Sequence, residues 1–292
     1  MRILVTGAEG QLGRCIRDAS AGSADEYIFT DVDDVDITDR EAVRLCLQVN
    51  DFDVVINCAA FTDVERAETQ EDIALKINGD AVRNLAEAAR EFGVTLIHIS
   101  TDYVFDGQTN VPVAEDAAAA PCGAYGRTKL VGERYIADSG CNALIIRTAW
   151  LYSEYGRNFV KTMFNLTNER DHLKVVVDQI GSPTYARDLA DAIVRIIESR
   201  VYKGREGVYH YSNTGVCSWF DLASMTARLS GHSDCNIAPC RSSEYPSKVV
   251  RPTYSVLDKS KFISTFGIAI PYWVDSLAEC VKRLKKAKND SL

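Results

Sequence analysis

The first half of the chain alternates short runs of aliphatic residues with longer amphipathic segments. The strand-like runs are Arg2–Thr6, Tyr27–Thr30, Asp53–Asn57, Val94–Ser100 and Asn142–Arg147. The helical patterns are Gln11–Ala19, Arg40–Val49, Glu71–Phe92 and Tyr125–Asp138. Continuously apolar strands separated by helices are typical of a parallel sheet that is covered on both faces. The pattern therefore predicts an α/β fold with a doubly wound parallel sheet, a Rossmann fold, whose ligands bind beyond the carboxyl ends of the strands.

After Arg147 this alternation becomes less regular. We expect strands at Lys174–Val177, Val208–Tyr211 and Cys235–Ala238. We expect helices at Asn158–Asn168, Ala186–Ser199, Trp219–Leu229, Asp258–Ser264 and Tyr272–Lys286. Residues 1–150 are therefore predicted to form a dinucleotide-binding domain. Residues 151–292 are predicted to form mainly a smaller α/β substrate-binding region, with some segments returning to the Rossmann core.

A glycine-rich segment, TGAEGQLG, follows the first predicted strand and opens the first predicted helix. Gly7 permits a tight turn, Gly10 lets backbone approach a pyrophosphate, and Gly13 permits close packing of helix and strand. The free N–H groups at the start of the helix, at Gln11 and Leu12, are expected to hold the pyrophosphate. The spacing Gly-x-x-Gly-x-x-Gly differs from the commoner Gly-x-Gly-x-x-Gly, but its position between strand and helix is the one that dinucleotide binding requires.

Asp31 ends the second predicted strand, where a carboxylate accepts hydrogen bonds from an adenosine ribose and repels a 2′-phosphate. That position favours NADH, although the nearby Arg14 keeps NADPH open; an ordinary loop carboxylate is the plain alternative. The other residues expected along the cofactor are Asp36, Ile37, Ala60, Phe61 and Thr62.

Tyr125 and Lys129 lie four residues apart in a predicted helix and therefore share one face of it. A free tyrosine has a pKa of about 10, so its phenol exchanges a proton poorly at neutral pH. A fixed positive charge beside the phenol would lower that pKa toward the working range. The hydroxyl of Thr101 is placed to hold a substrate oxygen next to the phenol. Tyr-x-x-x-Lys is frequent by chance, so the assignment depends on the motifs around it.

Together these motifs resemble the extended short-chain dehydrogenase/reductase superfamily and, within it, the family of dTDP-4-dehydrorhamnose reductases. The resemblance runs along nearly the whole chain. Its most specific segments are STDYVFDG from Ser100, YGRTKLVGE from Tyr125, RTAWLY from Arg147, NFVKTM from Asn158, DQIGSPT from Asp178, and Arg251-Pro252.

The resemblance implies roles for three catalytic residues. Tyr125 would protonate the sugar oxygen, and Lys129 would lower the pKa of that phenol while binding the nicotinamide ribose. Thr101 would take the place of the catalytic serine of the superfamily and donate to the substrate carbonyl. The implied reaction is reduction of the C4 ketone of dTDP-4-dehydro-β-L-rhamnose by NADPH or NADH, for cell-surface polysaccharide precursors.

Three further residues are implied in substrate binding. Asp102 and Trp150 would contact the deoxysugar, the indole offering an apolar face to the ring. Arg251 would clamp the diphosphate, because guanidinium binds phosphate through paired donors. The plain alternatives are a core aromatic at the end of a strand for Trp150 and a surface ion-pair partner for Arg251.

Three other functions of this fold can be compared with the same residues. A dehydratase carries a second carboxylate after the catalytic Thr-Asp, and Tyr103 stands at that position, which disfavours elimination. An epimerase that retains its cofactor uses the same Tyr and Lys and stays open. A non-catalytic subunit, similar to the regulatory subunit of methionine adenosyltransferase, is the alternative of a different class.

The net charge of −8 argues against binding to nucleic acid or to an anionic membrane. No apolar run is long enough for a bilayer span, and the nine scattered cysteines are expected to be reduced core thiols. We therefore expect a cytoplasmic enzyme with a small nucleotide-sugar substrate. Some relatives hold magnesium at a dimer contact, but Cys15 and Arg187 occupy the corresponding positions. No metal is expected, and a homodimer of another kind stays open.

Overall fold

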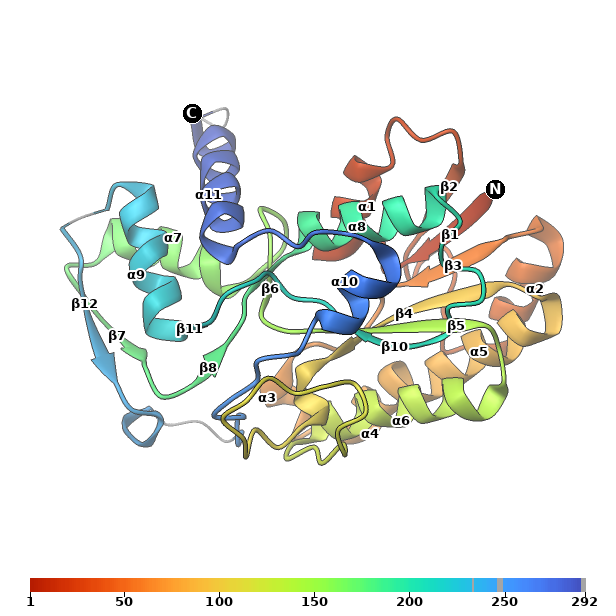
Figure 1. Cartoon of the computed structure of the whole chain (residues 1–292), viewed down its shortest axis with the longest axis horizontal. Helices are drawn as coiled ribbons and strands as arrows, with labels where there is room; N and C mark the ends of the chain where they lie inside the picture. The colour runs from red at the N-terminus through yellow and green to blue at the C-terminus, as the bar shows by residue number, and fades with distance from the viewer. Residues whose placement is uncertain (233, 246–248, 290–292) are drawn as a thin grey trace.

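The computed structural model describes residues 1–232, 234–245 and 249–289, and its main sheet is six-stranded and parallel (right-hand part of Figure 1). Its strands, in spatial order, are β2 (Glu26–Thr30), β1 (Arg2–Thr6), β3 (Val54–Asn57), β4 (Thr95–Thr101), β5 (Ala143–Thr148) and β10 (Gly207–His210). The chain winds outward from β1 in both directions, so the order reverses between β1 and β3. Ligands of doubly wound sheets bind at such a switch point. The predicted α/β fold is confirmed.

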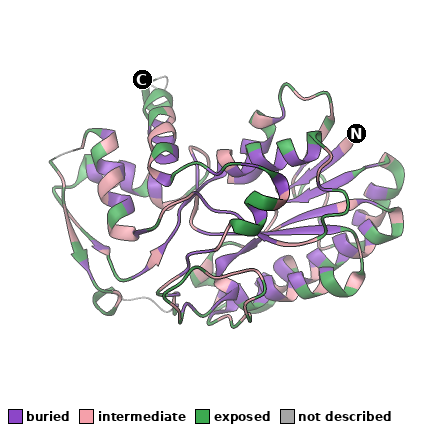
Figure 2. Ribbon diagram, in the orientation of Figure 1, coloured by how far each residue is buried: buried purple, intermediate pink, exposed green. Residues whose placement is uncertain are grey.

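Helices cover both faces of this sheet. On one face α1 (Gln11–Ala19) packs against α8 (Ala186–Glu198), and their apolar sides share a core with Ile3 and Val5 of β1. On the other face lie α2 (Arg40–Asn50), α5 (Ala81–Phe92) and α6 (Ala124–Ser139), which share a second core with Leu4. The alternating side chains of the inner strands thus enter two cores, and Figure 2 shows these strands mostly buried.

The predicted helix Glu71–Phe92 is interrupted in the structure. A short α4 (Glu71–Leu75) leads into a π-helical turn, η1 (Lys76–Asp80), before α5 begins. The turn buries Asn78, whose amide bonds Phe61 N at 2.8 Å, Phe61 O at 3.0 Å and Thr128 Oγ1 at 3.2 Å. Tertiary hydrogen bonds therefore compensate for the widened turn, and they tie the segment after β3 to α6.

The later part of the chain supplies both β10 and α8 of the main sheet layer and a second group of elements, at the left of Figure 1. The helices of that group are α7 (Phe159–Glu169), α9 (Trp219–Ser230) and α11 (Trp273–Asn289), while α10 (Ser260–Phe266) packs near β10. Its short strands pair as β7 (His172–Val176) with β12 (Asn236–Cys240), β8 (Ile180–Gly181) with β11 (Cys217–Ser218), and β6 (Leu151–Tyr152) with β9 (Thr184–Tyr185). The remaining short elements are α3 (Val64–Ala67), η2 (Asp102–Val104) and η3 (Ser242–Glu244).

Two expectations from composition meet the structure here. All nine cysteines are free, but the core holds only Cys15, Cys217, Cys240 and Cys280, and Cys122 is exposed. The expectation that all nine cysteines are core thiols was therefore wrong. Within the described ranges, no helix has both the length and the apolar character needed to span a bilayer.

Candidate active site

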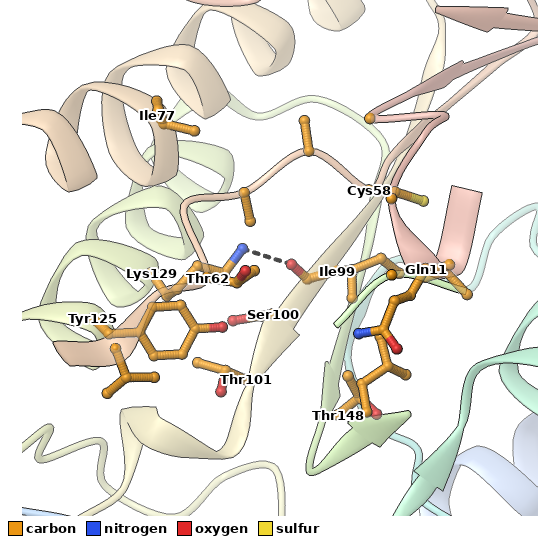
Figure 3. Close-up of a pocket in the computed structure, with 18 of the residues that line it drawn as sticks. Gln11, Cys58, Thr62, Ile77, Ile99, Ser100, Thr101, Tyr125, Lys129 and Thr148 are labelled. Carbon is orange, nitrogen blue, oxygen red and sulfur yellow. Dashed lines mark hydrogen bonds between the residues drawn. The ribbon is translucent and has the colours of Figure 1, made fainter. Parts of the chain in front are cut away.

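A cavity of about 910 Å³ lies along the carboxyl edge of the main sheet. Its walls come from the segments that follow β1, β2, β3, β4 and β5, and from the first turns of α6 and α9. Figure 3 shows Gln11 on one side of this cavity, facing Tyr125 and Lys129 on the other. The size suits an extended organic ligand, and the position is the switch point of the sheet.

The turn after β1 is shaped to bring backbone close to a ligand. Gly7 has φ +65°, and a Cβ there would lie 2.6 Å from the backbone nitrogen of Ala59. Because the N-cap of α1 is Gly10, no side chain caps the N-terminus of that helix. Uncapped N–H groups at a helix start attract anions, so the turn fits a diphosphate.

Asp31 lines this cavity just beyond the end of β2, and backbone N–H groups hold its carboxylate. Its Oδ2 accepts from Glu9 N at 2.9 Å and its Oδ1 accepts from Val32 N at 2.9 Å. Arg14 is the residue for which the sequence left NADPH possible. In the structure it instead donates to Glu9 Oε2 at 2.7 Å and to Glu9 O at 3.1 Å. The cavity wall after β2 thus carries a fixed carboxylate, and Arg14 adds no free guanidinium beside it.

Most residues predicted to bind the cofactor line the cavity, and two do not. Those lining it are Gly7, Gly10, Gln11, Leu12, Asp31, Asp36, Ile37, Ala60 and Thr62. Gly13 instead faces the backbone of Gly7 and Ala8, so it permits close packing of helix against turn rather than helix against strand. Phe61 does not line the cavity and packs on the buried cluster of Ala67, Ala74 and Ala124.

Thr101, Tyr125 and Lys129 line the cavity together, on the side opposite Gln11. Thr101 is the last residue of β4, and the other two occupy the first turns of α6. Lys129 is 1% exposed, and its Nζ donates to Ile99 O at 2.7 Å (Figure 3). Burial lowers the pKa of the Lys129 amine to about 8.

The pKa of Tyr125 moves opposite to the direction expected from its lysine neighbour. Burial raises the pKa of the phenol above its ordinary value, and contact with the Thr101 hydroxyl offsets only part of that rise. The ammonium of Lys129 does not overcome this, because its Nζ is directed to the β4 backbone. Tyr125 therefore keeps its proton at neutral pH, as a proton donor must.

Asp102 follows Thr101 and presents a buried carboxylate to the cavity. The Thr101 hydroxyl donates to Asp102 Oδ1 at 3.1 Å, whereas Oδ2 accepts no hydrogen bond from the described residues. The Ser255 hydroxyl lies near enough to lower the pKa of the carboxyl, but burial dominates and raises that pKa to about 6. An unsatisfied buried oxygen of this kind is an acceptor prepared for a ligand hydroxyl.

We expect Asp102→Asn to stabilise the protein, and only at neutral and alkaline pH. A folded pKa of about 6 against an ordinary 3.8 means that ionised Asp102 costs about 3 kcal/mol. That cost is absent below the unfolded pKa, grows as pH rises from 3.8, and is complete above the folded pKa. Urea unfolding at pH about 4 and about 8 measures it, with the exposed Asp138→Asn as control, expected to stay within about 0.5 kcal/mol. Equal gains at both pH values would show that ionisation of Asp102 is not the cause.

Trp150 lies between β5 and β6, lines the cavity and has φ +49°. Its ring stacks on Trp219 with centroids 3.6 Å apart and planes 10° apart. Trp219 is the first residue of α9 and donates from Nε1 to Gln179 Oε1 at 3.1 Å. Sequence reasoning missed Trp219 as a site residue. The capping box of Ser218 locates the helix start, but only the packing of α9 turns the indole toward the cavity.

Arg251 fits both interpretations that the sequence left open, a diphosphate clamp and a surface ion-pair partner. It lines the cavity beside Tyr103, and its Nη2 lies 3.4 Å from Glu65 Oε1 in an ion pair. Its side chain is 30% exposed, so the pair is accessible to solvent and weak. The guanidinium is therefore available to an anionic ligand.

Arg187 and Cys15 lie away from this cavity. Arg187 donates to Asp18 Oδ2 at 2.6 Å and to Glu154 Oε1 at 2.8 Å, which places a cation between two carboxylates. Burial raises the pKa of the Cys15 thiol to about 12, so it stays protonated. Over residues 1–232, 234–245 and 249–289, no group of three or more His, Cys, Asp and Glu side chains is arranged to hold a metal ion.

Comparison with known proteins places these observations in a family. The model of the RmlD substrate binding domain matches residues 1–286. A dTDP-4-keto-6-deoxy-D-glucose reductase of Streptomyces niveus is 39% identical, over 95% of this chain and 96% of its own length. A dTDP-4-dehydrorhamnose reductase structure from Clostridium acetobutylicum is 44% identical, with a TM-score of 0.93 over 98% of this chain and 100% of that one. Another, from Bacillus anthracis in complex with NADP, is 35% identical, with a TM-score of 0.90 over 97% and 99%.

Proposed function

The chain belongs to the RmlD substrate binding domain family, and we propose that it reduces the C4 ketone of dTDP-4-dehydro-β-L-rhamnose to dTDP-L-rhamnose with NADH or NADPH. One observation carries the proposal: Thr101, Tyr125 and Lys129 converge in a single cavity that begins at the glycine turn of Gly7. The product is a precursor of cell-surface polysaccharide. Similarity to reductases of dTDP-linked 4-keto sugars along nearly the whole chain supports the substrate class.

Thr101, Tyr125 and Lys129 each have a separate role in the proposed reduction. A bound nicotinamide supplies the hydride for the ketone carbon. The Thr101 hydroxyl donates to the ketone oxygen and stabilises the charge that develops there. Tyr125 gives its proton to the same oxygen, a favourable transfer because an alkoxide is more basic than a phenolate. Lys129 holds the ribose end of the cofactor.

We assign substrate binding to four other residues that line the cavity, Asp102, Trp150, Trp219 and Arg251. Asp102 Oδ2, which lacks a partner among the described residues, accepts from a sugar hydroxyl. The stacked indoles of Trp150 and Trp219 provide an apolar wall for the deoxysugar ring. Arg251 exchanges its solvent-accessible pair with Glu65 for the diphosphate.

We expect NADH to be preferred over NADPH. The Asp31 carboxylate, fixed by two backbone N–H groups, accepts from a ribose 2′-hydroxyl but repels a 2′-phosphate. The change Asp31→Ser should lower the ratio of kcat/KM for NADH to kcat/KM for NADPH by roughly one to two orders of magnitude, equivalent to about 1.4–2.8 kcal/mol. Steady-state kinetics with each cofactor measure it, and Asp33→Ser, an exposed change in the same loop, is the control. An unchanged ratio would remove Asp31 from cofactor selection.

The decisive test is oxidation of the reduced cofactor by dTDP-4-dehydro-β-L-rhamnose, followed at the nicotinamide absorbance. Turnover with this sugar above other keto-sugar nucleotides supports the proposal. The relative from Streptomyces niveus favours a second candidate, reduction of dTDP-4-keto-6-deoxy-D-glucose, which the same panel distinguishes. Tightly bound cofactor that survives purification would point to an epimerase. Silence with every sugar, together with a stable protein partner, would point to a regulatory subunit.

A cytoplasmic site of action and a homodimer are further parts of the proposal. The substrates are charged nucleotides of the cell interior, which supports the first. Sedimentation of the purified chain tests the second.

A further inference from the structure

A chain of buried side-chain contacts joins the glycine turn to Lys129. The Thr6 hydroxyl donates to Asn57 Oδ1 at 2.8 Å, and the backbone N–H of Ala59 donates to the same oxygen at 3.1 Å. Asn57 Nδ2 lies 3.1 Å from Nδ1 of His98, whose Nε2 lies 3.3 Å from Lys129 Nζ. Asn57 and His98 are both 0% exposed. These contacts join β1, β3, β4 and α6 directly beneath the cavity.

The donors in this chain fix the tautomer of His98. A backbone N–H can only donate, so the atom of Asn57 that faces Ala59 must be its oxygen. The amide nitrogen of Asn57 therefore faces His98 and donates to Nδ1. Burial, followed by the charge of Lys129, holds the pKa of His98 well below its ordinary value, so the ring is neutral. A neutral ring whose Nδ1 accepts carries its proton on Nε2.

This proton points at the amine of Lys129. An ammonium group has donors only, and the short bond to Ile99 O uses one of them. The charged amine thus meets the Nε2–H of His98 donor to donor, whereas the uncharged amine accepts a hydrogen bond from it. We infer that His98 is a positioning residue whose fixed Nε2–H opposes the charged form of Lys129 and stabilises the uncharged form.

The other groups that face Lys129 do not oppose its charge. Glu133, one turn further along α6, and Cys58, after β3, both raise the pKa of the amine. Tyr125, on the same face of α6, keeps its proton and carries no charge. Burial lowers the pKa of Lys129, and the His98 N–H acts in the same direction.

A second buried histidine shows the opposite arrangement. His210 on β10 places Nδ1 3.1 Å from Val113 O, an acceptor, so its proton lies on Nδ1. Its Nε2 is then free to accept from Arg147 Nη1, 3.4 Å away. His210 thus accepts a hydrogen bond from the charged Arg147, whereas His98 opposes the charge of Lys129. The difference comes from the neighbour of Nδ1, a carbonyl for His210 and an amide NH₂ for His98.

The tautomer can be observed directly in the protein without substrate. Long-range ¹H–¹⁵N NMR of the imidazole rings separates the two neutral forms, and the chain has only four histidines to assign. We expect an unprotonated Nδ1 for His98 and an unprotonated Nε2 for His210. A proton on Nδ1 of His98, or a charged ring at neutral pH, would overturn the inference. This result is independent of the proposed function, since no turnover is measured.

The effect on Lys129 is measured by following the ¹³Cε signals of labelled lysines against pH. The signal of Lys129 is assigned as the one that disappears in the Lys129→Met variant. In His98→Gln the side-chain amide can turn its oxygen to the ammonium, so the titration midpoint of Lys129 should rise by about one to two pH units. The matched control His210→Gln, the same change at a buried histidine that does not face Lys129, should leave the midpoint in place. Coincident midpoints in the three proteins would refute the inference.

A second variant covers the case in which His98→Gln does not fold. Asn57→Asp keeps the shape and both accepted bonds, but its second oxygen accepts from Nδ1–H and reverses the tautomer of His98. The midpoint of Lys129 should rise here too, and the Nδ1 signal of His98 should become that of a protonated nitrogen. A rise without the change of tautomer would trace the effect to the new charge alone and count against His98. If the proposed function holds, the alkaline limb of kcat should move with the midpoint.

Discussion

Tyr125→Phe is expected to lower kcat by about 10³-fold while the dissociation constant of NADH changes by less than about threefold. The phenyl ring preserves the packing on the buried cluster of Ala67, Ala74 and Ala124 and the edge-to-face contact with Tyr103, whose centroid lies 5.5 Å away. Only the transferable proton is lost. Because burial keeps the pKa of this phenol above its ordinary value, wild-type Tyr125 stays protonated through neutral pH and is competent in the direction of reduction. Steady-state kinetics give kcat, and fluorescence titration gives cofactor binding.

Tyr135→Phe is the matched control for this experiment. Tyr135 lies on the same helix but contacts Arg83, 4.8 Å from the ring, and does not line the cavity. Its substitution should leave kcat within about twofold. A Tyr125→Phe enzyme with near-normal turnover would mean that another group, or water, protonates the ketone. A loss of cofactor binding equal to the loss of kcat would mean that the phenol positions the cofactor instead.

The main sheet and the glycine turn could be predicted because their signals are local. The strand Arg2–Thr6 and the helix Gln11–Ala19 appear with the bounds read from the sequence. The positive φ of Gly7 follows from a turn that brings its Cα against Ala59. The strand period and the helix period each report burial over a few neighbouring residues, which suffices to order a parallel sheet.

Other features depend on contacts between distant segments. Gly126 gives no local signal beyond its composition, yet a Cβ there would clash with Tyr103 O, so the approach of α6 to η2 requires glycine. The π-helical turn at Asn78 forms because Phe61 and Thr128 bond that side chain. A helical period alone predicted one continuous helix through it.

The electrostatics of the site were predicted least well, for the same reason. The spacing of Tyr125 and Lys129 places them on one face, but it does not say what else the amine contacts. In the structure Ile99 O and His98 contact the amine from β4, and burial raises rather than lowers the pKa of the phenol. The sign of a pKa shift is set by the whole surroundings of a group, which a sequence motif does not contain.

A buried ion pair next to the candidate active site gives the largest expected loss of stability. Arg147 on β5 donates from Nη2 to Glu133 Oε2 at 2.7 Å and from Nε to Glu133 Oε1 at 3.0 Å. Both side chains are at most 7% exposed, and the Ser100 hydroxyl donates to the same carboxylate at 2.5 Å. We expect Glu133→Gln to lower the free energy of unfolding by about 3 kcal/mol, because it leaves a buried guanidinium without its counter-charge. Urea unfolding at constant m-value measures the loss.

The exposed ion pair of Arg44 and Glu91 is the control for Glu133→Gln. It tests whether the loss of stability comes from the burial of the charges or from the loss of an ion pair as such. Arg44 Nη2 lies 2.7 Å from Glu91 Oε1, the same separation as in the buried pair, but the two side chains are 41% and 45% exposed. Glu91→Gln should therefore cost less than about 1 kcal/mol. The double variant Glu133→Leu with Arg147→Met removes both buried charges and should regain much of the loss, since desolvation offsets most of the attraction within such a pair. Similar costs for Glu133→Gln and Glu91→Gln would contradict the argument. A double variant no more stable than Glu133→Gln would instead show that the ion pair itself, which ties β4, β5 and α6 around Thr101 and Lys129, stabilises the fold by more than its desolvation costs.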